Sequence, residues 1–169
     1  NDSITGVQVN NSYDISTDIV VLAIGHSARD TFRLLYDKGI SMRPKNFAVG
    51  VRIEHPRSMI DWNQYGKFSK VLGAASYKLT HTTSSGRGVY SFCMCPGGFV
   101  VNASSEEGRL VVNGMSNYKR DEKNSNSALV VTVGPKDFGN NPMDGIEFQR
   151  KLEEKVGNWI KTDGYVQQG

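Results

Sequence analysis

The stretch from Phe47 to Ile53 alternates apolar residues with small or polar ones without a break, and this pattern constrains the fold more than any other feature. A period of two is the repeat of a β-strand, whose successive side chains point to opposite faces. One face would carry Phe47, Val49, Val51 and Ile53, and the other Ala48, Gly50 and Arg52. The pattern therefore predicts a strand whose apolar face is covered and whose other face is half exposed.

The centre of the chain predicts an antiparallel meander. Its strand patterns are Val89–Met94, Phe99–Ala103 and Leu110–Asn113, with turns at Cys95–Gly98 and Ser104–Gly108. Apolar runs bounded by Gly, Pro and Ser clusters are typical of short strands joined by tight turns. After a polar loop over residues 115–127, a further strand is predicted at Ala128–Val133.

The N-terminal part predicts a hairpin, a buried strand and a helix. Ile4–Val9 and Ser12–Ser16 alternate around Asn10-Asn11, which is a turn signal. The apolar run Asp18–Gly25 is typical of a strand buried on both faces, as in a parallel sheet. A helix should follow with Ser27 as N-cap, supported by Asp30 three residues later, and should end at Gly39.

Two more helices are predicted in the C-terminal part. One spans residues 57–65, and residues 66–88 follow as a long excursion with little regular structure. The last helix begins at Asp144 and carries an apolar stripe of Phe148, Leu152, Val156 and Trp159. The predicted fold class is α+β: mainly antiparallel sheet with packing helices, plus a remnant of a parallel α/β sheet at the N-terminal end. The predicted domains are residues 1–42 and 43–169.

Composition excludes several classes of partner. Twenty basic and seventeen acidic residues leave a net charge of +3, too mild and too scattered for a nucleic-acid-binding face. No apolar run reaches the ~18 residues that span a bilayer, so no membrane partner is expected. Cys93 and Cys95 are the only cysteines, which favours a reducing, cytoplasmic setting over a disulfide framework. The three histidines show no ligand spacing with them, so no metal site is predicted.

The segment Gly25-His26-Ser27 allows a serine hydrolase hypothesis, because G-x-S-x-G turns expose a nucleophile between strand and helix. Arg29 stands where that motif needs its second glycine, and no histidine follows His81 to act as the downstream base. A helix cap at Ser27 explains the same residue. A self-contained α+β ligand-binding module without redox chemistry is the other alternative.

The segment that ends at Ala23-Ile24-Gly25 resembles the closing section of the FAD-binding domain in glutathione-reductase-like flavoproteins, with Ile in place of the usual Thr. There, a small meander leads into a strand whose glycine lets the backbone pass close to the nucleotide. Further motifs are similar to those of a bacterial FAD-dependent dehydrogenase family: His26–Phe32, Phe47–Pro56, Cys93–Gly98, Asn113–Ser116 and Asn126–Val131. The resemblance covers nearly the whole chain.

The resemblance implies an oxidoreductase that uses FAD on an unassigned small-molecule substrate. No G-x-G-x-x-G follows a strand, so the pyrophosphate site is expected in a missing N-terminal part. The chain is accordingly expected to be an internal fragment that covers the substrate side of the flavin. Its partner would be the remaining FAD-binding domain of the same polypeptide, and the fragment alone is expected to bind no FAD and to be inactive.

Candidate site residues follow from this resemblance. Gly25, Gly97 and Gly98 are the candidate cofactor-binding residues, because a glycine admits close approach to the backbone. Cys95 and Arg52 are the candidate catalytic residues. Simpler interpretations stay open: a hairpin turn at Cys95–Gly98, a packed thiol at Cys95 and an exposed strand face at Arg52.

Overall fold

The structure, a computed structural model, describes residues 3–163, with side chains described as far as residue 158. Trp159 of the predicted apolar stripe and the tail Gly164–Gly169 lie outside these described parts. The chain divides into two compact units, residues 1–39 and 40–169. This division falls close to the predicted boundary after residue 42, and the assignment of the first unit to an FAD-binding domain stays a prediction.

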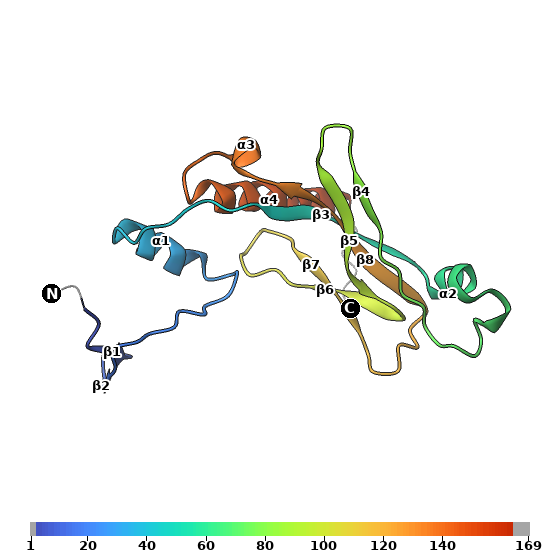
Figure 1. Cartoon of the computed structure of the whole chain (residues 1–169), viewed down its shortest axis with the longest axis horizontal. Helices are drawn as coiled ribbons and strands as arrows, with labels where there is room; N and C mark the ends of the chain where they lie inside the picture. The colour runs from blue at the N-terminus through green and yellow to red at the C-terminus, as the bar shows by residue number, and fades with distance from the viewer. Residues whose placement is uncertain (1–2, 164–169) are drawn as a thin grey trace. The chain divides into compact units, whose positions relative to one another are not determined.

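The first unit begins with the predicted hairpin. Strands β1 (Gly6–Val9) and β2 (Tyr13–Ser16) pair antiparallel (Figure 1). Asn10 and Asn11 connect them with φ values of 52° and 53°. Asparagine tolerates this left-handed region better than most residues, which explains why this pair can make the turn.

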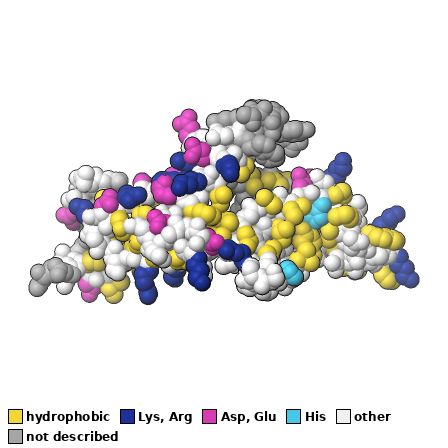
Figure 2. All heavy atoms as spheres, turned by 90° about the horizontal axis from the view of Figure 1, so that it is seen from above, with side chains coloured by type: hydrophobic (Ala, Val, Ile, Leu, Met, Phe, Trp, Pro, Cys, Tyr) yellow, Lys and Arg dark blue, Asp and Glu magenta, His cyan; other side chains and the backbone are white. Residues whose placement is uncertain are grey.

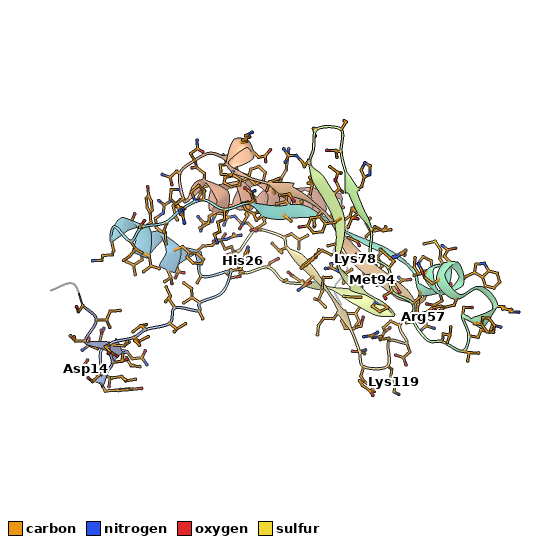
Figure 3. All side chains as sticks on the ribbon, in the orientation of Figure 1. Asp14, His26, Arg57, Lys78, Met94 and Lys119 are labelled. Atoms are coloured by element: carbon orange, nitrogen blue, oxygen red, sulfur yellow. The ribbon has the colours of Figure 1, made fainter. Side chains whose placement is uncertain are left out.

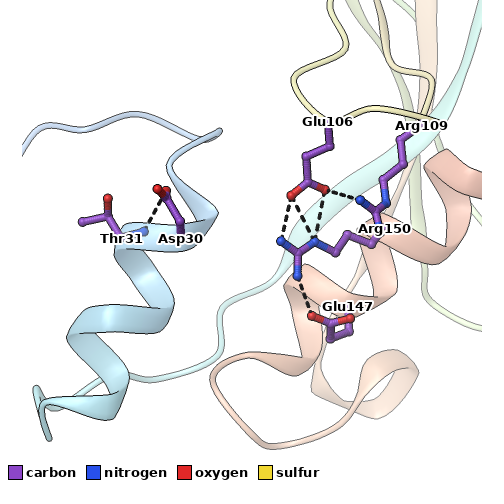
Figure 4. A network of polar contacts seen from close by, with 6 residues as sticks. All are labelled: Asp30, Thr31, Glu106, Arg109, Glu147 and Arg150. Carbon is purple, nitrogen blue, oxygen red and sulfur yellow. Dashed lines mark hydrogen bonds and ion pairs between the residues drawn. The ribbon is translucent and has the colours of Figure 1, made fainter.

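Helix α1 (Arg29–Asp37) confirms the predicted helix but not its predicted cap. Ala28 is the N-cap residue and no side chain caps the helix. Ser27 lies one residue too early, and its carbonyl oxygen accepts a hydrogen bond from the Arg29 N–H at 2.9 Å. Asp30 Oδ1 instead accepts the N–H of Thr31 at 2.8 Å (Figure 4). The predicted end is confirmed, since Gly39 has φ of 78°.

The predicted buried strand at 18–25 is wrong. These residues form no strand, and their apolar side chains are exposed, with Val21 85% and Ile19 74% accessible. A parallel strand needs neighbours that satisfy its backbone groups, and no described strand pairs with this run. Every described strand pair is antiparallel, so the α+β class is confirmed and the parallel remnant is not found.

The second unit contains a four-stranded antiparallel sheet with strand order β3-β8-β5-β4 (Figure 1). The strands are β3 (Phe47–Pro56), β8 (Asn124–Val133), β5 (Gly88–Cys95) and β4 (Thr80–Thr82). Strands β6 (Gly98–Asn102) and β7 (Val112–Ser116) form a separate two-stranded sheet. The predicted meander is therefore confirmed only in part: β6 pairs antiparallel with β7, whereas β5 pairs with β8 and β4 and not with β6.

Helix α2 (Arg57–Tyr65) confirms the prediction for residues 57–65, and a 3-10 turn η1 (Gly66–Phe68) follows it. Buried Asp61 holds the excursion after them, because its Oδ1 accepts the N–H of Ala75 at 2.7 Å. Helix α3 (Pro135–Phe138) was not predicted. Asp137 on α3 forms a two-pronged ion pair with Arg87 at the start of the β5 hairpin.

Helix α4 (Asp144–Asp163) closes the unit. The Phe47 ring contacts those of Phe138 and Phe148, with centroids 5.1 and 6.3 Å apart. Glu106 fixes the helix to the loop before β7 by accepting hydrogen bonds from Arg150 and Arg109, and Arg150 also pairs with Glu147 (Figure 4). These carboxylates raise the pKa of Arg150.

The predicted apolar face of β3 is covered only in part. Phe47 packs against helices, whereas Val51 and Ile53 are 66% and 43% exposed, and Leu129 opposite Val51 on β8 is also exposed. Figure 2 shows further hydrophobic side chains at the surface of this unit, in the half of the picture that contains β4, β5 and α2. Among the described residues, no helix has the length and apolar character needed to cross a membrane.

Candidate functional site

A β-bulge lies at the C-terminal end of β5. Phe92 faces Ala128 and Cys95 faces Asn126, so β5 holds one residue more than β8 between these pairs. Cys93 takes up the difference with φ of 47°, a left-handed conformation that costs a non-glycine residue roughly 1–3 kcal/mol. Phe92 and Cys93 are both exposed as a result, and Cys95 is buried. Met94, labelled in Figure 3, marks the position of the bulge.

The bulge interrupts the alternation of side chains between the two faces of β5 that the sequence predicts. Two adjacent side chains, Phe92 and Cys93, are exposed where strict alternation would bury one of them. Bulges occur next to functional sites because they redirect a side chain. The sequence carries no signal for the bulge, since its residues have no glycine to mark the left-handed position.

The guanidinium of Arg52 ties the bulge to two other strands. Its Nη1 donates to the Cys93 carbonyl at 3.1 Å and to Asn126 Oδ1 at 2.7 Å, and its Nη2 donates to Asn113 Oδ1 at 3.3 Å. All of these acceptors are neutral, and no carboxylate among the described residues pairs with Arg52. The structure therefore brings the predicted candidate Arg52 into a polar cluster with an uncompensated positive charge.

Asn126 lies beneath this cluster and is fully buried on β8. Its Oδ1 accepts from Arg52, whereas its Nδ2 is buried with no hydrogen-bond partner, as is Arg52 Nε. Buried donors without partners are rare in folded proteins. Asn126 and Asn113 were not predicted as site residues, because 74 and 61 residues separate them from Arg52 in the sequence.

Gly114 on β7 allows the cluster to close. A Cβ atom at this position would collide with Asn126 Oδ1 and Arg52 Nη1 and would lie 2.9 Å from Cys95 Sγ. The amide, the guanidinium and the thiol therefore converge on the side of Gly114 where a side chain would stand. Asn113 Oδ1 also accepts the N–H of Gly114 at 2.8 Å, which fixes its orientation toward Arg52.

The turn at Cys95–Gly98 packs tightly against the chain itself. Gly97 has φ of 50°, and a Cβ there would strike the Arg120 carbonyl; one at Gly98 would strike the Met115 carbonyl. Ser125 Oγ accepts the Gly97 N–H at 3.0 Å beneath the turn. The close approach that these two glycines permit is thus to β7 and the loop after it, and their cofactor-binding role stays a prediction.

The loop after β7 is also held from the other side. Arg57, at the start of α2, donates from its N–H to the Lys123 carbonyl at 3.0 Å and from its Nη1 to the Arg120 carbonyl at 3.1 Å. Figure 3 labels Arg57 together with Lys119 in this loop. The loop after β7, against which Gly97 packs, is therefore held by hydrogen bonds from Arg57.

The two thiols differ in environment. Cys95 is 7% exposed, and its Sγ donates to the Cys93 carbonyl at 3.4 Å. Burial is the main reason that the pKa of the Cys95 thiol is raised; Cys93 raises it further, and Arg52 opposes the shift. Cys93 is exposed, with its Sγ 4.0 Å from Asn113 Oδ1. The candidate Cys95 is therefore a protonated, packed thiol.

Other sequence candidates lie outside this cluster. Gly25 belongs to the first unit, has φ of 76° and would meet nothing within 4 Å if it carried a Cβ. Ser27 is exposed, and no described histidine forms a hydrogen bond with it. His55 lies edge-on to Tyr77, with ring centroids 5.5 Å apart. Within the described part of the chain, no three His, Cys, Asp or Glu side chains gather as a metal site.

Comparison with known proteins identifies the family. Residues 46–166 match the family described as "FAD-dependent protein, C-terminal domain-like". The chain belongs to this family. A relative from Clostridium beijerinckii, described as "Uncharacterized protein", is 58% identical over 147 residues, which are 85% of this chain and 28% of the relative. The chain thus spans less than a third of the length of that relative.

The cluster of this FAD-dependent protein C-terminal domain fits one side of a flavin site. Arg52 Nε and Asn126 Nδ2 are buried donors without partners, suited to a carbonyl or anionic oxygen. The sequence contains no G-x-G-x-x-G segment to hold a pyrophosphate. The two buried donors suit an oxygen atom of a flavin ring or of a substrate.

Proposed function

We propose that this chain is the substrate-side domain of an FAD-dependent oxidoreductase of the dehydrogenase type, within a longer polypeptide that binds most of the FAD. Family membership over residues 46–166 supports the link to FAD. The relative's greater length supports the longer polypeptide. Bound FAD would supply the electron acceptor, and the residues of this chain would orient the substrate and stabilise charge.

The charge of Arg52 is the observation that carries this proposal. Its guanidinium bonds only to neutral oxygens in the cluster of Cys93, Asn113 and Asn126. A negative charge at ~4 Å would gain about 4 kcal/mol from it at an effective dielectric of ~20. Two-electron oxidation of a substrate would leave added negative charge on the flavin that accepts the electrons, and Arg52 would stabilise that charge or bind a carboxylate that the substrate already carries.

The donors without partners would orient the bound ligand. Arg52 Nε and Asn126 Nδ2 are both donors without partners, and each would be available to an oxygen atom of a ligand. Asn126 is fully buried and its Oδ1 is held by Arg52 Nη1 at 2.7 Å, so the orientation of this amide is fixed before a ligand arrives. Such preorganisation lowers the free energy cost of binding.

The remaining part of the same polypeptide would be the partner of this domain. Val51, Ile53 and Leu129 form an exposed apolar face on β3 and β8. Covering this face with another part of the polypeptide would remove apolar area from water and stabilise the contact. A cytoplasmic location is part of this proposal. It is supported by two free cysteines, which are typical of a reducing compartment.

The redox role can be tested by the midpoint potential of the flavin in the full-length polypeptide. Arg52→Met should retain FAD and shift the potential to more negative values, because the cation that favours added charge is lost. Arg52→Lys, which keeps the charge, should shift it less. The matched control Arg43→Met removes an exposed arginine of the same unit and should leave the potential unchanged.

Two outcomes would oppose the proposal. Equal potentials in Arg52→Met, Arg43→Met and the unaltered protein would show that the cluster lies away from the flavin. A full-length protein that takes up no FAD on reconstitution would instead favour a ligand-binding module without redox chemistry.

A further inference from the structure

We propose that the cluster around Arg52 binds the carboxylate of the substrate, and that the substrate is a carboxylic acid with an apolar body. This inference rests on the proposed function, which assigns the chain to the substrate side of a flavin. It adds the chemical class of the substrate. Binding of a carboxylate is measured without electron transfer, so its outcome is separate from that of the redox role.

Arg52 has N–H groups to spare. A guanidinium carries five of them, on Nε, Nη1 and Nη2. Nη1 donates to the Cys93 carbonyl and to Asn126 Oδ1, and Nη2 donates to Asn113 Oδ1. The N–H of Nε, which is buried, and one N–H of Nη2 therefore have no acceptor among the described residues. Neighbouring nitrogens of a guanidinium form paired hydrogen bonds with the two oxygens of a carboxylate.

Asn126 gives the cluster a second buried donor. The residue is fully buried on β8, and its Nδ2 has no hydrogen-bond partner in the described part of the chain. Its Oδ1 is held by Arg52 Nη1 at 2.7 Å, so the amide cannot exchange its two ends without losing that bond. Buried donors without partners are rare in folded proteins, and an oxygen atom of a ligand would satisfy them.

The charge of the cluster matches an anion that carries a single negative charge. The acceptors bonded to Arg52 are neutral, and among the described residues no carboxylate pairs with it. Glu54 lies opposite Asn126 in the β3–β8 pairing, but it is exposed and forms no ion pair with Arg52. A phosphate carries more than one negative charge at pH 7, and Glu54 would repel the excess. One guanidinium therefore selects a carboxylate.

The surface beside Arg52 is apolar. Arg52 pairs with Ala128 across the sheet, and Ala128 pairs with Phe92, so the three side chains lie on one face. Phe92 is 63% exposed and directly precedes Cys93, whose carbonyl accepts a hydrogen bond from Arg52. An apolar group attached to the bound carboxylate would lie near the Phe92 ring and would remove apolar surface from water.

Calorimetric titration of the full-length polypeptide tests this inference. The probes are acetate, hexanoate and phenylacetate, each compared with its neutral amide. We expect hexanoate and phenylacetate to bind saturably at one site and at least about tenfold more tightly than their amides, because the amides lose the charged hydrogen bonds to the guanidinium. Acetate should bind more weakly than either acid, because it has no apolar body to cover Phe92.

Variants separate the contribution of each contact. Arg52→Met should weaken phenylacetate binding at least about tenfold. Arg52→Lys should keep the preference for acid over amide but bind less tightly, because an ammonium does not form the paired hydrogen bonds. Phe92→Ala, at an exposed position, should weaken phenylacetate and leave acetate unchanged. Arg43→Met removes an exposed arginine and is the matched control.

Three results would overturn the inference. The first is equal affinity of acids and amides for the unaltered protein, and the second is tighter binding of inorganic phosphate than of any acid. The third is acid binding that persists in Arg52→Met while circular dichroism shows this variant to be folded. In contrast, acid binding that depends on Arg52, together with an unchanged midpoint potential in Arg52→Met, would support the carboxylate site and oppose the redox role alone.

Discussion

Replacing Arg52 with methionine should lower the free energy of unfolding by about 2–3 kcal/mol. The substitution removes the hydrogen bonds to the Cys93 carbonyl, Asn126 Oδ1 and Asn113 Oδ1. Asn126 is fully buried, and a buried acceptor left without a partner costs about 1–3 kcal/mol. The Cys93 carbonyl adds about 1 kcal/mol. Asn113 is exposed and its oxygen can turn to water, so it adds little.

An opposing effect limits the loss. Arg52 has no carboxylate partner among the described residues, so its removal leaves no buried counter-charge behind. Methionine also keeps a flexible apolar side chain of similar reach, which fills part of the space. These two effects keep the expected loss below the about 3–5 kcal/mol typical of a broken buried ion pair.

Urea denaturation of the 169-residue chain, followed by tryptophan fluorescence, measures this loss. Both tryptophans, Trp62 and Trp159, belong to the second unit. Arg52→Lys should lie between methionine and the unaltered chain, because an ammonium satisfies fewer of the acceptors. Arg43→Met is the matched control. The reasoning is refuted if Arg52→Met and Arg43→Met both unfold within about 0.5 kcal/mol of the unaltered chain, the range of ordinary surface substitutions.

Two further predictions concern the same region. Gly98→Ala should lower the melting temperature clearly, because the added Cβ would strike the backbone of β7. Gly88→Ala is the control and should leave the melting temperature unchanged, because the atom nearest to its added Cβ lies at 3.9 Å. Equal melting temperatures in the two variants would contradict the close packing of the turn. The folded state raises the pKa of Cys95 above its ordinary value of 9.0, so its contribution to stability should be complete below pH 9 and decline as pH rises through the folded pKa. Urea denaturation at graded alkaline pH should show a steeper decline in the unaltered chain than in Cys95→Ala, and parallel curves would argue against a buried neutral thiol.

Local pattern was enough to predict the elements that depend on their own residues. The hairpin around Asn10-Asn11 carries a turn signal, and the strand from Phe47 carries a period of two. The strand predicted at 18–25 is wrong because an apolar run forms a buried strand only where neighbouring strands pair with it, and no described strand pairs with this run. Its conformation is decided by residues outside the run.

The candidate site could be predicted only in part. Arg52 and Cys95 were identified from a resemblance, but Asn113 and Asn126 join them only through strand pairings across the sheet. The bulge that separates exposed Cys93 from buried Cys95 depends on a left-handed residue that is not glycine. Such a conformation persists where the surrounding structure holds it and has no local sequence signal; in the structure, Arg52 donates to the Cys93 carbonyl at this position.

The FAD content of the full-length polypeptide, compared with that of the isolated 169-residue chain, tests the central claim most directly. FAD is added to both, excess is removed, and the cofactor released by denaturation is quantified against protein. We expect one FAD per full-length chain and none on the isolated chain, since the chain lacks a phosphate-binding fingerprint. Stoichiometric FAD on the isolated chain, or none on the full-length polypeptide, would contradict the assignment of this domain to the substrate side of a flavin site.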